Sequence, residues 1–266
     1  MHAENEALPG GNPKLKPADG CSKLEPVKIS VVVPAFNEER LLARSLAGIK
    51  SAAGAFARRG WAVELIVCDN NSTDRTAEIA RSAGALVVFE PVNQIARARN
   101  RGAAAATGDW LVFVDADSRP SAELFAEVAE QIQSGRYLAG GSTVRMDEKH
   151  LMAEFFTWLW NCSSRMGRWL AGSFIFVEAA AFRKLGGFSD KLFAAEELDL
   201  SKRLKQLARE TGRGIVILHR HPLVTSARKL RLYTTWDHLK LLARVLFNRR
   251  ALTRRDSCTL WYDGRR

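Results

Sequence analysis

Two aspartates separated by one alanine follow directly after an apolar run near the middle of the chain. The stretch 110–118 reads WLVFVDADS, so Asp115 and Asp117 come immediately after five apolar residues. Residues two apart in an extended strand point to the same side, so both carboxylates face the same way. Such carboxylates repel each other unless a cation or a hydrogen-bond donor lies between them. The pattern predicts a site for Mg²⁺ or Mn²⁺, because these ions take one or two protein carboxylates and complete their shell with water and substrate phosphates.

Polar segments also follow two other apolar runs. The segment PAFNE at 34–38 follows the first run of the chain, and DNNSTD at 69–74 follows the second. Ligands of open α/β sheets bind outside the carboxyl ends of the strands, where such segments gather. If the strands are parallel, all three polar segments lie at one edge of the sheet. The expected ligand is a diphosphate, which the metal would neutralise as it leaves.

The elements that must position these residues alternate along the first half of the chain. Apolar runs predict strands at 29–34, 63–68, 85–89 and 110–114, and helical spacing predicts helices at 41–56, 73–83, 95–106 and after the N-cap Ser121. The second half predicts an antiparallel strand at 137–146, a helix at 150–166 with an aromatic cluster at 155–160, a strand at 173–177 and a helix at 196–210. The fold class is therefore α/β, a mostly parallel sheet flanked by helices with a mixed subregion in its second half.

Charge is concentrated at the end of the chain. The formal net charge is +11, and residues 219–266 hold 12 Lys and Arg against 3 Asp and Glu. Within 229–266, helical spacing of Leu232, Trp236, Leu239, Leu242 and Leu246 predicts a basic amphipathic helix. This helix would either pack on the domain or lie on an anionic membrane. The basic tail itself suits an anionic partner or a merely solvated surface.

The rest of the composition indicates where in the cell the protein is expected. Residues 1–26 are polar and rich in Pro and Gly, which predicts a flexible leader and no signal peptide. The four cysteines are scattered without CxxC pairs, which favours a reducing compartment. No apolar run approaches the roughly 20 residues that a membrane-spanning helix needs. We expect a cytoplasmic protein, at the inner face of the membrane if the tail binds lipid.

The motifs together resemble those of the family 2 nucleotide-sugar glycosyltransferases. They are VVVPAFNEE, CDNNSTDRT, ARNRG, FVDADS, and GGF followed by EELDL, in the expected order between residues 29 and 204. The resemblance implies the GT-A (Rossmann-like) fold as a single domain over 27–228. Its nucleotide-binding half would cover about 27–135 and its acceptor half about 136–228.

The resemblance also implies roles for individual residues. Those on the donor side are Pro34, Ala35 and Glu38 in the nucleoside pocket, Asp69 and Asn70 in the base-binding loop, Arg99 and Asn100 beside the nucleotide, Asp115 facing the ribose and metal, and Asp117 as the principal metal ligand. Asn70 stands where the family commonly has a second acidic residue, which leaves the identity of the base open. For Arg99 and Asn100 the alternative is a helix with an exposed basic face.

The acceptor side carries the expected base. The family's acidic motif is usually Glu-Asp, and this chain has Glu196 and Glu197. The base maps onto Glu197, with Glu196 as the alternative, or the pair only complements the dipole of its helix. Gly172, Ser173 and Asp199 map to the acceptor side. His219 and His221 alternate as on one face of a strand, which suits either a further metal ligand or ordinary surface histidines.

The function that follows is transfer of a sugar from a nucleotide-sugar donor to a hydroxyl acceptor, dependent on Mg²⁺ or Mn²⁺ and with inversion at the anomeric centre. The acceptor would be a glycan or a lipid-linked molecule, in the synthesis of cell-envelope polysaccharide, glycolipid or lipid-linked glycan. The alternatives are a catalytically silent sugar-nucleotide-binding module and a nucleic-acid-binding protein that uses the basic tail. The last is disfavoured, because the tail lacks a recognised nucleic-acid-binding motif.

Overall fold

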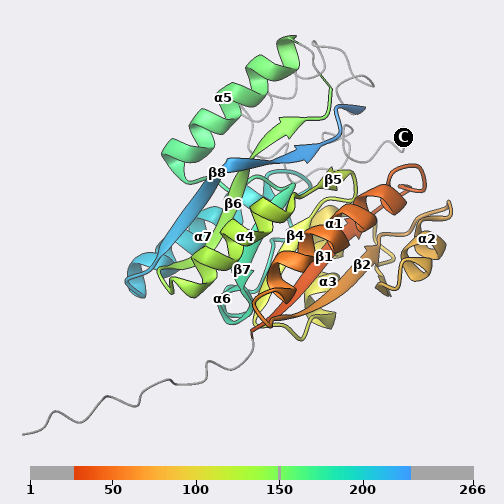
Figure 1. The fold of residues 1–266 in the computed structure, drawn as a ribbon, viewed down its shortest axis with the longest axis horizontal. Coiled ribbons are helices and arrows are strands. Elements are labelled where there is room, and N and C mark those ends of the chain that lie inside the picture. The colour runs from red at the N-terminus through yellow and green to blue at the C-terminus, as the bar shows by residue number, and fades with distance from the viewer. Residues whose placement is uncertain (1–26, 149–150, 229–266) are drawn as a thin grey trace, which may run out of the picture.

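The computed structural model of the chain describes residues 27–148 and 151–228, shown in Figure 1. The predicted leader at 1–26 and the predicted tail helix at 229–266 lie outside the described residues. The first half contains β1 (Lys28–Ala35), α1 (Leu42–Ala57), β2 (Ala62–Asp69), α2 (Thr76–Ser82), β3 (Leu86–Phe89), α3 (Ile95–Ala105) and β4 (Trp110–Val114). The second half contains β5 (Ser118–Arg119), α4 (Ala122–Gln133), β6 (Tyr137–Met146), α5 (Leu151–Gly167), β7 (Phe174–Glu178), α6 (Ala179–Lys184), α7 (Glu196–Glu210) and β8 (Gly214–Thr225).

The strands form one eight-stranded sheet in the order β3-β2-β1-β4-β7-β6-β8-β5. The pairs among β1, β2, β3 and β4 are parallel, as is the pair β6 and β8. Strand β7 is antiparallel to β4 and β6, and β5 is antiparallel to β8. The predicted α/β class, the mostly parallel sheet and the mixed second half are confirmed. The antiparallel prediction for 137–146 holds only for its pairing with β7, because β6 runs parallel to β8.

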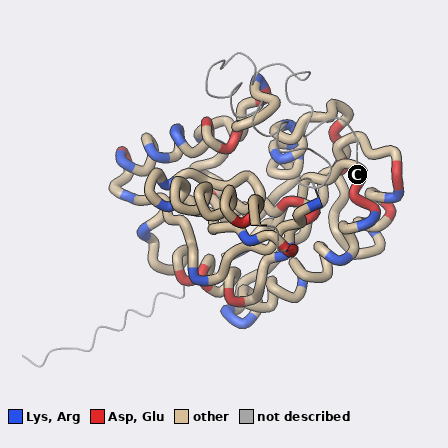
Figure 2. Tube along the Cα trace, turned by 90° about the horizontal axis from the view of Figure 1, so that it is seen from above, with Lys and Arg blue, Asp and Glu red and all other residues tan. Residues whose placement is uncertain are grey.

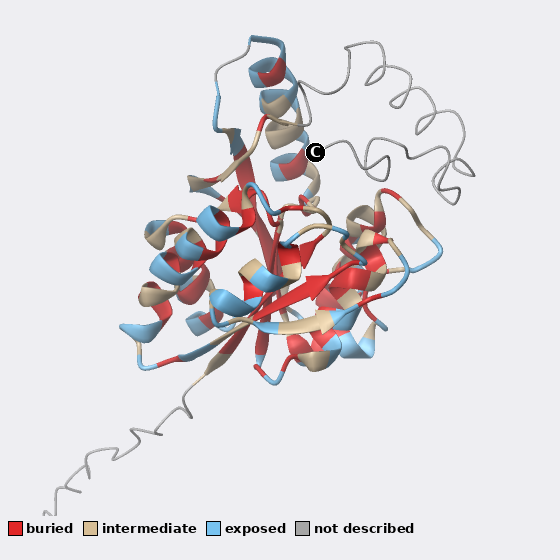
Figure 3. Cartoon of the chain, turned by 90° about the vertical axis from the view of Figure 1, so that its right-hand side faces the viewer, coloured by how far each residue is buried: buried red, intermediate tan, exposed pale blue. Residues whose placement is uncertain are grey.

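Helices cover both faces of this sheet, and each interface holds its own apolar core. One core joins α1 and α4 to the sheet around Phe56 and Phe125, whose ring centroids lie 4.9 Å apart. The other core joins α3, α6 and α7 to the opposite face, around Phe113 and Phe182. Figure 3 shows these buried layers in red, while α5 stands beyond them with much of its surface exposed.

Small residues bring α3 close to the sheet. Ala96, Ala98, Gly102 and Ala103 form its buried side. A Cβ added to Gly102 would lie 2.4 Å from Cγ1 of Val32, so only glycine permits this approach. The close packing fixes the position of Arg99, which lies one turn before Gly102 on the same helix.

The helices and strands that were predicted are present in the structure, and the start of the second helix differs most from its prediction. Ser121 accepts a hydrogen bond from the Leu124 N–H at 3.1 Å, so the predicted N-cap is confirmed. The helix predicted from residue 73 begins only at Thr76, because the Asp74 carboxylate accepts the Thr76 N–H at 2.9 Å. The two-residue strand β5 and the short helix α6 were not predicted, since so few residues show no periodicity. The twelve-residue strand β8 was not predicted either, apart from the alternation of His219 and His221.

The described surface is mixed in charge. Figure 2 shows Lys and Arg interspersed with Asp and Glu along the described part of the chain. Over the same residues, no helix combines the length and the apolar character that crossing a bilayer requires.

Candidate active site

Three polar segments meet at one edge of the sheet, as predicted. In the parallel pair β1 and β2, Ala35 lies opposite Asp69, and β1 pairs with β4 on its other side. The segments that follow these three strands therefore begin side by side. Together they carry Glu38, Asp69, Asp115 and Asp117 within one region of the molecule.

Arg99 joins this edge to the acceptor half. Its guanidinium donates to Glu196 Oε1 at 2.6 Å, Asp115 Oδ1 at 3.0 Å and the Gly172 carbonyl at 2.8 Å. The side chain is 2 % exposed and lies over the Phe188 ring, 5.2 Å from its centroid. Burial alone would lower the pKa of Arg99, but Asp115, Glu196 and Glu197 together raise it. The alternative of an exposed basic helix face is therefore wrong for Arg99.

A small cavity of about 170 Å³ opens beside Arg99. Its walls are formed by Ile95, Arg99, Asp115, Gly172, Ser173, Phe193, Ala194, Ala195, Glu196 and Glu197. Predicted donor-side and acceptor-side residues thus line the same space. A Cβ added to Gly172 would lie 3.2 Å from Nη2 of Arg99 and 3.7 Å from Cδ of Glu197, so glycine keeps this wall open.

The two glutamates at the start of α7 have different environments. Glu196 is 3 % exposed and is held by Arg99, whereas Glu197 lines the cavity, and no ion pair within the described residues holds its carboxylate. Burial and the nearby Glu196 and Asp115 carboxylates raise the pKa of Glu197 to about 8, against the opposing effect of Arg99. A carboxyl group with a pKa near neutrality is suited to accept a proton in a reaction at that pH.

A strained residue sets the direction of these two side chains. Ala195 precedes α7 with φ 61° and ψ 22°, the left-handed region that non-glycine residues rarely adopt. Its carbonyl accepts the N–H groups of Leu198 at 3.1 Å and Asp199 at 3.2 Å, so the helix begins immediately after the turn. The first turn of α7 is thereby brought against the cavity.

The two aspartates after β4 are held differently. Asp115 pairs with Arg99 through its side chain, and its N–H donates to the Ser173 carbonyl at 3.2 Å. Asp117 is 8 % exposed and accepts a hydrogen bond from Ser118 Oγ at 3.5 Å. Within the described residues, no group of three or more His, Cys, Asp or Glu side chains is arranged to hold a metal. One or two carboxylates still fit Mg²⁺ or Mn²⁺, because these ions draw their other ligands from water and phosphate.

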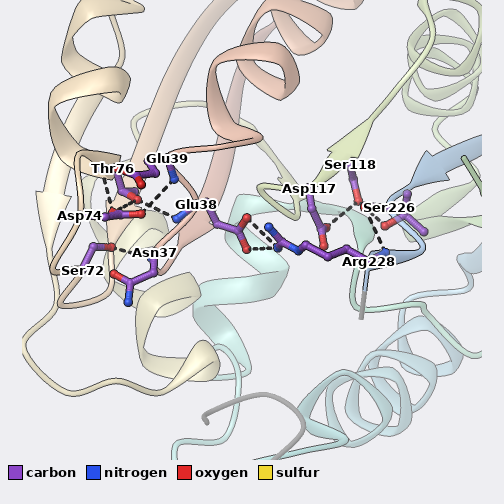
Figure 4. Close-up of polar contacts among 11 residues, drawn as sticks. Asn37, Glu38, Glu39, Ser72, Asp74, Thr76, Asp117, Ser118, Ser226 and Arg228 are labelled. Carbon is purple, nitrogen blue, oxygen red and sulfur yellow. Dashed lines mark hydrogen bonds and ion pairs between the residues drawn. The ribbon is translucent and has the colours of Figure 1, made fainter. Parts of the chain in front are cut away.

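The residues predicted to line the nucleoside pocket lie at the ends of β1 and β2 and in the loops that follow them. Pro34 and Ala35 are buried at the end of β1, and Asp69 accepts the Ser72 N–H at 3.0 Å. Asn37 has φ 51° and links the two loops, because its N–H donates to Ser72 Oγ at 3.0 Å and its Oδ1 accepts the Thr73 N–H at 2.8 Å. Figure 4 shows the contact between Asn37 and Ser72 on its left.

Three other predicted residues contact the protein itself. The amide of Asn70 donates to the carbonyls of Glu90 and Val92, and that of Asn100 exchanges two hydrogen bonds with the Phe188 backbone. Asp199 forms an ion pair with Arg203 at 2.8 Å. Asn100 and Asp199 do not line the cavity. The alternative of surface histidines fits His221, whose Nδ1 lies 3.1 Å from Glu127 Oε1 on α4.

Arg228 contacts the predicted site residue Glu38, and the sequence did not predict this pairing. Its Nη2 lies 2.8 Å from both carboxylate oxygens of Glu38, and in Figure 4 its side chain runs past Asp117 to reach Glu38. The two partners are 190 residues apart in the chain. No spacing rule links such distant positions, and Arg228 lay among the many cations of the basic end.

Known proteins similar to this chain identify its family. Residues 30–181, more than half of the chain, match the family described as Glycosyl transferase family 2. The chain belongs to this family. It is 34% identical over 113 residues to the uncharacterized glycosyltransferase Mb0553 of Mycobacterium bovis, covering 42% of this chain and 47% of that protein. It is 31% identical over 124 residues to the dolichol-phosphate mannosyltransferase of Pyrococcus furiosus, covering 44% of this chain and 33% of that protein.

Solved structures of glycosyltransferases share the fold. The mannosyltransferase PcManGT from Pyrobaculum calidifontis, in complex with GDP-Man and Mn²⁺, gives a TM-score of 0.63 at 22% identity, covering 86% of this chain and 62% of that one. The structure of S. aureus TarS 1–349 gives a TM-score of 0.59 at 18% identity, covering 89% of this chain and 78% of that one. Glucosyl-3-phosphoglycerate synthase from Mycobacterium tuberculosis, in complex with Mg²⁺ and UDP, gives 0.55 at 21%, covering 82% and 76%. The predicted GT-A fold is confirmed.

The match to the curated relatives is partial in length. The first relatives are matched over 26% to 47% of their own length. The family and fold are therefore established for this chain, and its activity is inferred from the site.

Proposed function

We propose that the protein transfers a sugar from a nucleotide-sugar donor to a hydroxyl acceptor, with inversion and with a divalent metal. The observation that carries this proposal is the position of Glu197. Its carboxyl group lines a cavity shared with Asp115 and Arg99, and its pKa is raised to about 8. This position supports Glu197 as the proton acceptor, next to the residues expected to hold the donor.

The reaction balances around Glu197. Its ionised carboxylate takes the proton of the acceptor hydroxyl while that oxygen attacks the anomeric carbon. The bond from the anomeric carbon to the diphosphate oxygen breaks, and the nucleoside diphosphate leaves from the opposite face. One displacement inverts the anomeric centre, through a transition state resembling the oxocarbenium ion of glycoside hydrolysis. Arg99 holds Glu196 and Asp115 in place, so Glu197 is the carboxylate left to face the acceptor.

Asp117 and Asp115 are the residues that would hold the metal. When bound, Mg²⁺ or Mn²⁺ neutralises charge that develops on the departing diphosphate. The proposal is supported by the oxygen-only donor set and by two structural neighbours whose complexes contain Mn²⁺ with GDP-Man or Mg²⁺ with UDP. Asp117 is buried to 8 % exposure, so a bound ion would lie largely out of bulk solvent.

We further propose an acceptor at the cytoplasmic surface of a membrane, in the synthesis of a lipid-linked glycan or glycolipid. Helix α5 supports this, because it exposes Leu151 (86%), Phe155 (53%), Trp158 (59%) and Met166 (88%). Exposed aromatic side chains on an amphipathic helix are typical of contact with the lipid interface. The cations Arg165 and Arg168 at the end of α5 are exposed and suit anionic headgroups.

The test is incubation with a panel of nucleotide sugars, Mn²⁺ or Mg²⁺, and hydroxyl acceptors, with release of nucleoside diphosphate as the readout. We expect release with at least one donor, dependent on the metal and abolished in Glu197→Gln. The absence of turnover with every donor, with and without metal, would reject the proposal. Donor binding without turnover would instead favour the catalytically silent binding module.

A further inference from the structure

Arg228 is anchored beside the expected metal site by backbone contacts. The N–H of Ser226 donates to the Asp117 carbonyl at 3.2 Å, and the N–H of Ala227 donates to Asp147 Oδ1 at 2.9 Å. Strand β8, which leads to Arg228, pairs with β5 through Thr225 and Ser118, and β5 begins immediately after Asp117. The structure therefore carries Arg228 to the residues that follow β4.

The guanidinium of Arg228 is only partly satisfied. Its Nη2 serves both oxygens of Glu38, and the two side chains are 17% and 5% exposed. Its Nε and Nη1 are buried and have no hydrogen-bond acceptor within the described part of the chain. Buried donors without acceptors are destabilising, and more so on a charged group. A group with several acceptor oxygens would remove this penalty.

We propose that Arg228 binds the diphosphate of the donor through Nε and Nη1, with Glu38 as the carboxylate that holds the guanidinium in place. This inference rests on the proposed function, which supplies a nucleoside diphosphate at this edge of the sheet. A diphosphate offers several acceptor oxygens, which the planar fork of arginine fits. Glu38 and Asp117 would repel the same anion, so a fixed cation between them lowers the cost of binding.

A purely structural role for Arg228 makes a different prediction. An arginine that only fastened β8 to the loop after β1 would affect stability and leave ligand affinity unchanged. The affinity must therefore be compared between ligands that contain a diphosphate and ligands that lack it. Arg220 offers a matched control, because it lies on β8, is 69% exposed and pairs with Glu127 at 3.1 Å.

The experiment is calorimetric titration of the full chain with inorganic pyrophosphate, UDP, GDP, uridine and guanosine, each with Mn²⁺. The proteins are wild type, Arg228→Gln, Arg228→Lys and the control Arg220→Gln. We expect Arg228→Gln to weaken pyrophosphate and nucleoside diphosphate binding by about 10- to 100-fold, the effect of losing charge-assisted hydrogen bonds. Binding of the nucleosides should be unchanged, Arg228→Lys should be intermediate, and Arg220→Gln should match wild type.

The outcomes separate this inference from the proposed function. If wild type binds a nucleoside diphosphate and Arg228→Gln binds it equally well, the role of Arg228 is wrong while the proposed function stands. The same conclusion follows if nucleoside and diphosphate affinities fall together. If Arg228→Gln does not fold, Arg228→Lys serves as the test, because lysine keeps the positive charge but lacks the planar guanidinium. Unchanged pyrophosphate affinity in Arg228→Lys would contradict the proposed use of both Nε and Nη1. Wild type that binds neither pyrophosphate nor any nucleotide overturns both.

Discussion

The carboxylate of Glu196 lies 2.6 Å from Nη1 of Arg99, and the two side chains are 4% and 2% exposed. This buried pair distinguishes two glutamates that are adjacent in the chain. Because Glu196 is neutralised by Arg99, it is a weak candidate for accepting a proton. Glu197 lines the cavity without such a partner among the described residues, which favours it as the proposed base.

Replacing Glu197 with Gln should abolish turnover while sparing donor binding. General-base catalysis typically contributes about 10²- to 10⁴-fold, so kcat should fall by that order. The measurement is steady-state release of nucleoside diphosphate, with donor affinity from titration. Glu196→Gln is the comparison, and we expect it mainly to lower stability, since it weakens the buried pair. Equal kcat for Glu197→Gln and wild type would contradict the assignment of the base.

The pH profile should show the raised pKa of Glu197. As pH falls below about 8, the carboxyl group becomes protonated, so kcat/KM should fall along a single-proton limb. Stability should change in the opposite direction. Between its ordinary value of 4.5 and about 8, folded Glu197 keeps a proton that the unfolded chain has released, so the free energy of unfolding falls as pH rises. Glu197→Gln should become more stable relative to wild type over this range. A constant difference in denaturant unfolding from pH 5 to 8.5 would contradict the raised pKa.

Removing the buried cation should destabilise the fold. Arg99→Met leaves Glu196 and Asp115 without their partner, and breaking a buried ion pair typically costs about 3–5 kcal/mol. Denaturant unfolding measures this loss. Arg75→Ala is the control, because Arg75 pairs with Glu78 at 2.9 Å on the exposed surface, and we expect little change there. Arg99→Met with the stability of wild type would show that the network is dispensable for folding.

Metal-dependent donor binding should require Asp117. Asp117→Asn keeps the shape of the side chain but removes its charge, so affinity for nucleoside diphosphate with Mn²⁺ should fall by roughly tenfold or more. Chelation of the metal should weaken wild type to a similar level and have little further effect on the variant. Asp190→Asn, at an exposed position, should behave as wild type. Metal-independent binding by wild type would reject the role given to Asp117.

The exposed face of α5 should mediate membrane binding. Phe155→Ser with Trp158→Ser should reduce sedimentation with anionic phospholipid vesicles by at least about tenfold, because each buried apolar side chain contributes roughly 1.5–3 kcal/mol. Phe89→Ser is the control, since Phe89 is equally exposed at 51% but lies on β3. Thermal unfolding should be little changed in both the double variant and the control. Vesicle binding that is lost equally in Phe89→Ser, or retained without the α5 aromatics, would exclude α5 as the contact.

How much could be predicted from the sequence depends on whether a feature is set by residues close together in the chain or by residues far apart. The strand Trp110–Val114 and the helix Glu196–Glu210 were predicted to the residue, because apolar periodicity is a local signal. Asp115 and Asp117 were proposed as site residues from their position at the end of such a strand, and Glu197 from the resemblance to the acidic motif of the family. The pairing of Glu38 with Arg228 was not predicted, because it depends on how β8 and β5 meet across the whole sheet.

Other misses have equally physical causes. The sequence cannot show that Asn100 contacts the Phe188 backbone, since this requires the close approach of Gly187, which has φ 73°. Nor can it show which of two adjacent glutamates pairs with Arg99. That depends on the left-handed turn at Ala195 and on the depth to which Gly102 lets α3 approach the sheet.

The Arg99 network has a consequence for recombining this domain with relatives. A chimaera that exchanged the part after Asp115 would inherit Arg99 and Asp115 from one parent and Gly172 and Glu196 from the other. If the parent that supplies the second half has a neutral side chain in place of Glu196, the buried positive charge of Arg99 would lose one of its two carboxylate partners. A graft meant to change acceptor specificity must therefore first supply side chains that balance the charge of Arg99. How well the new acceptor fits matters only after that condition is met.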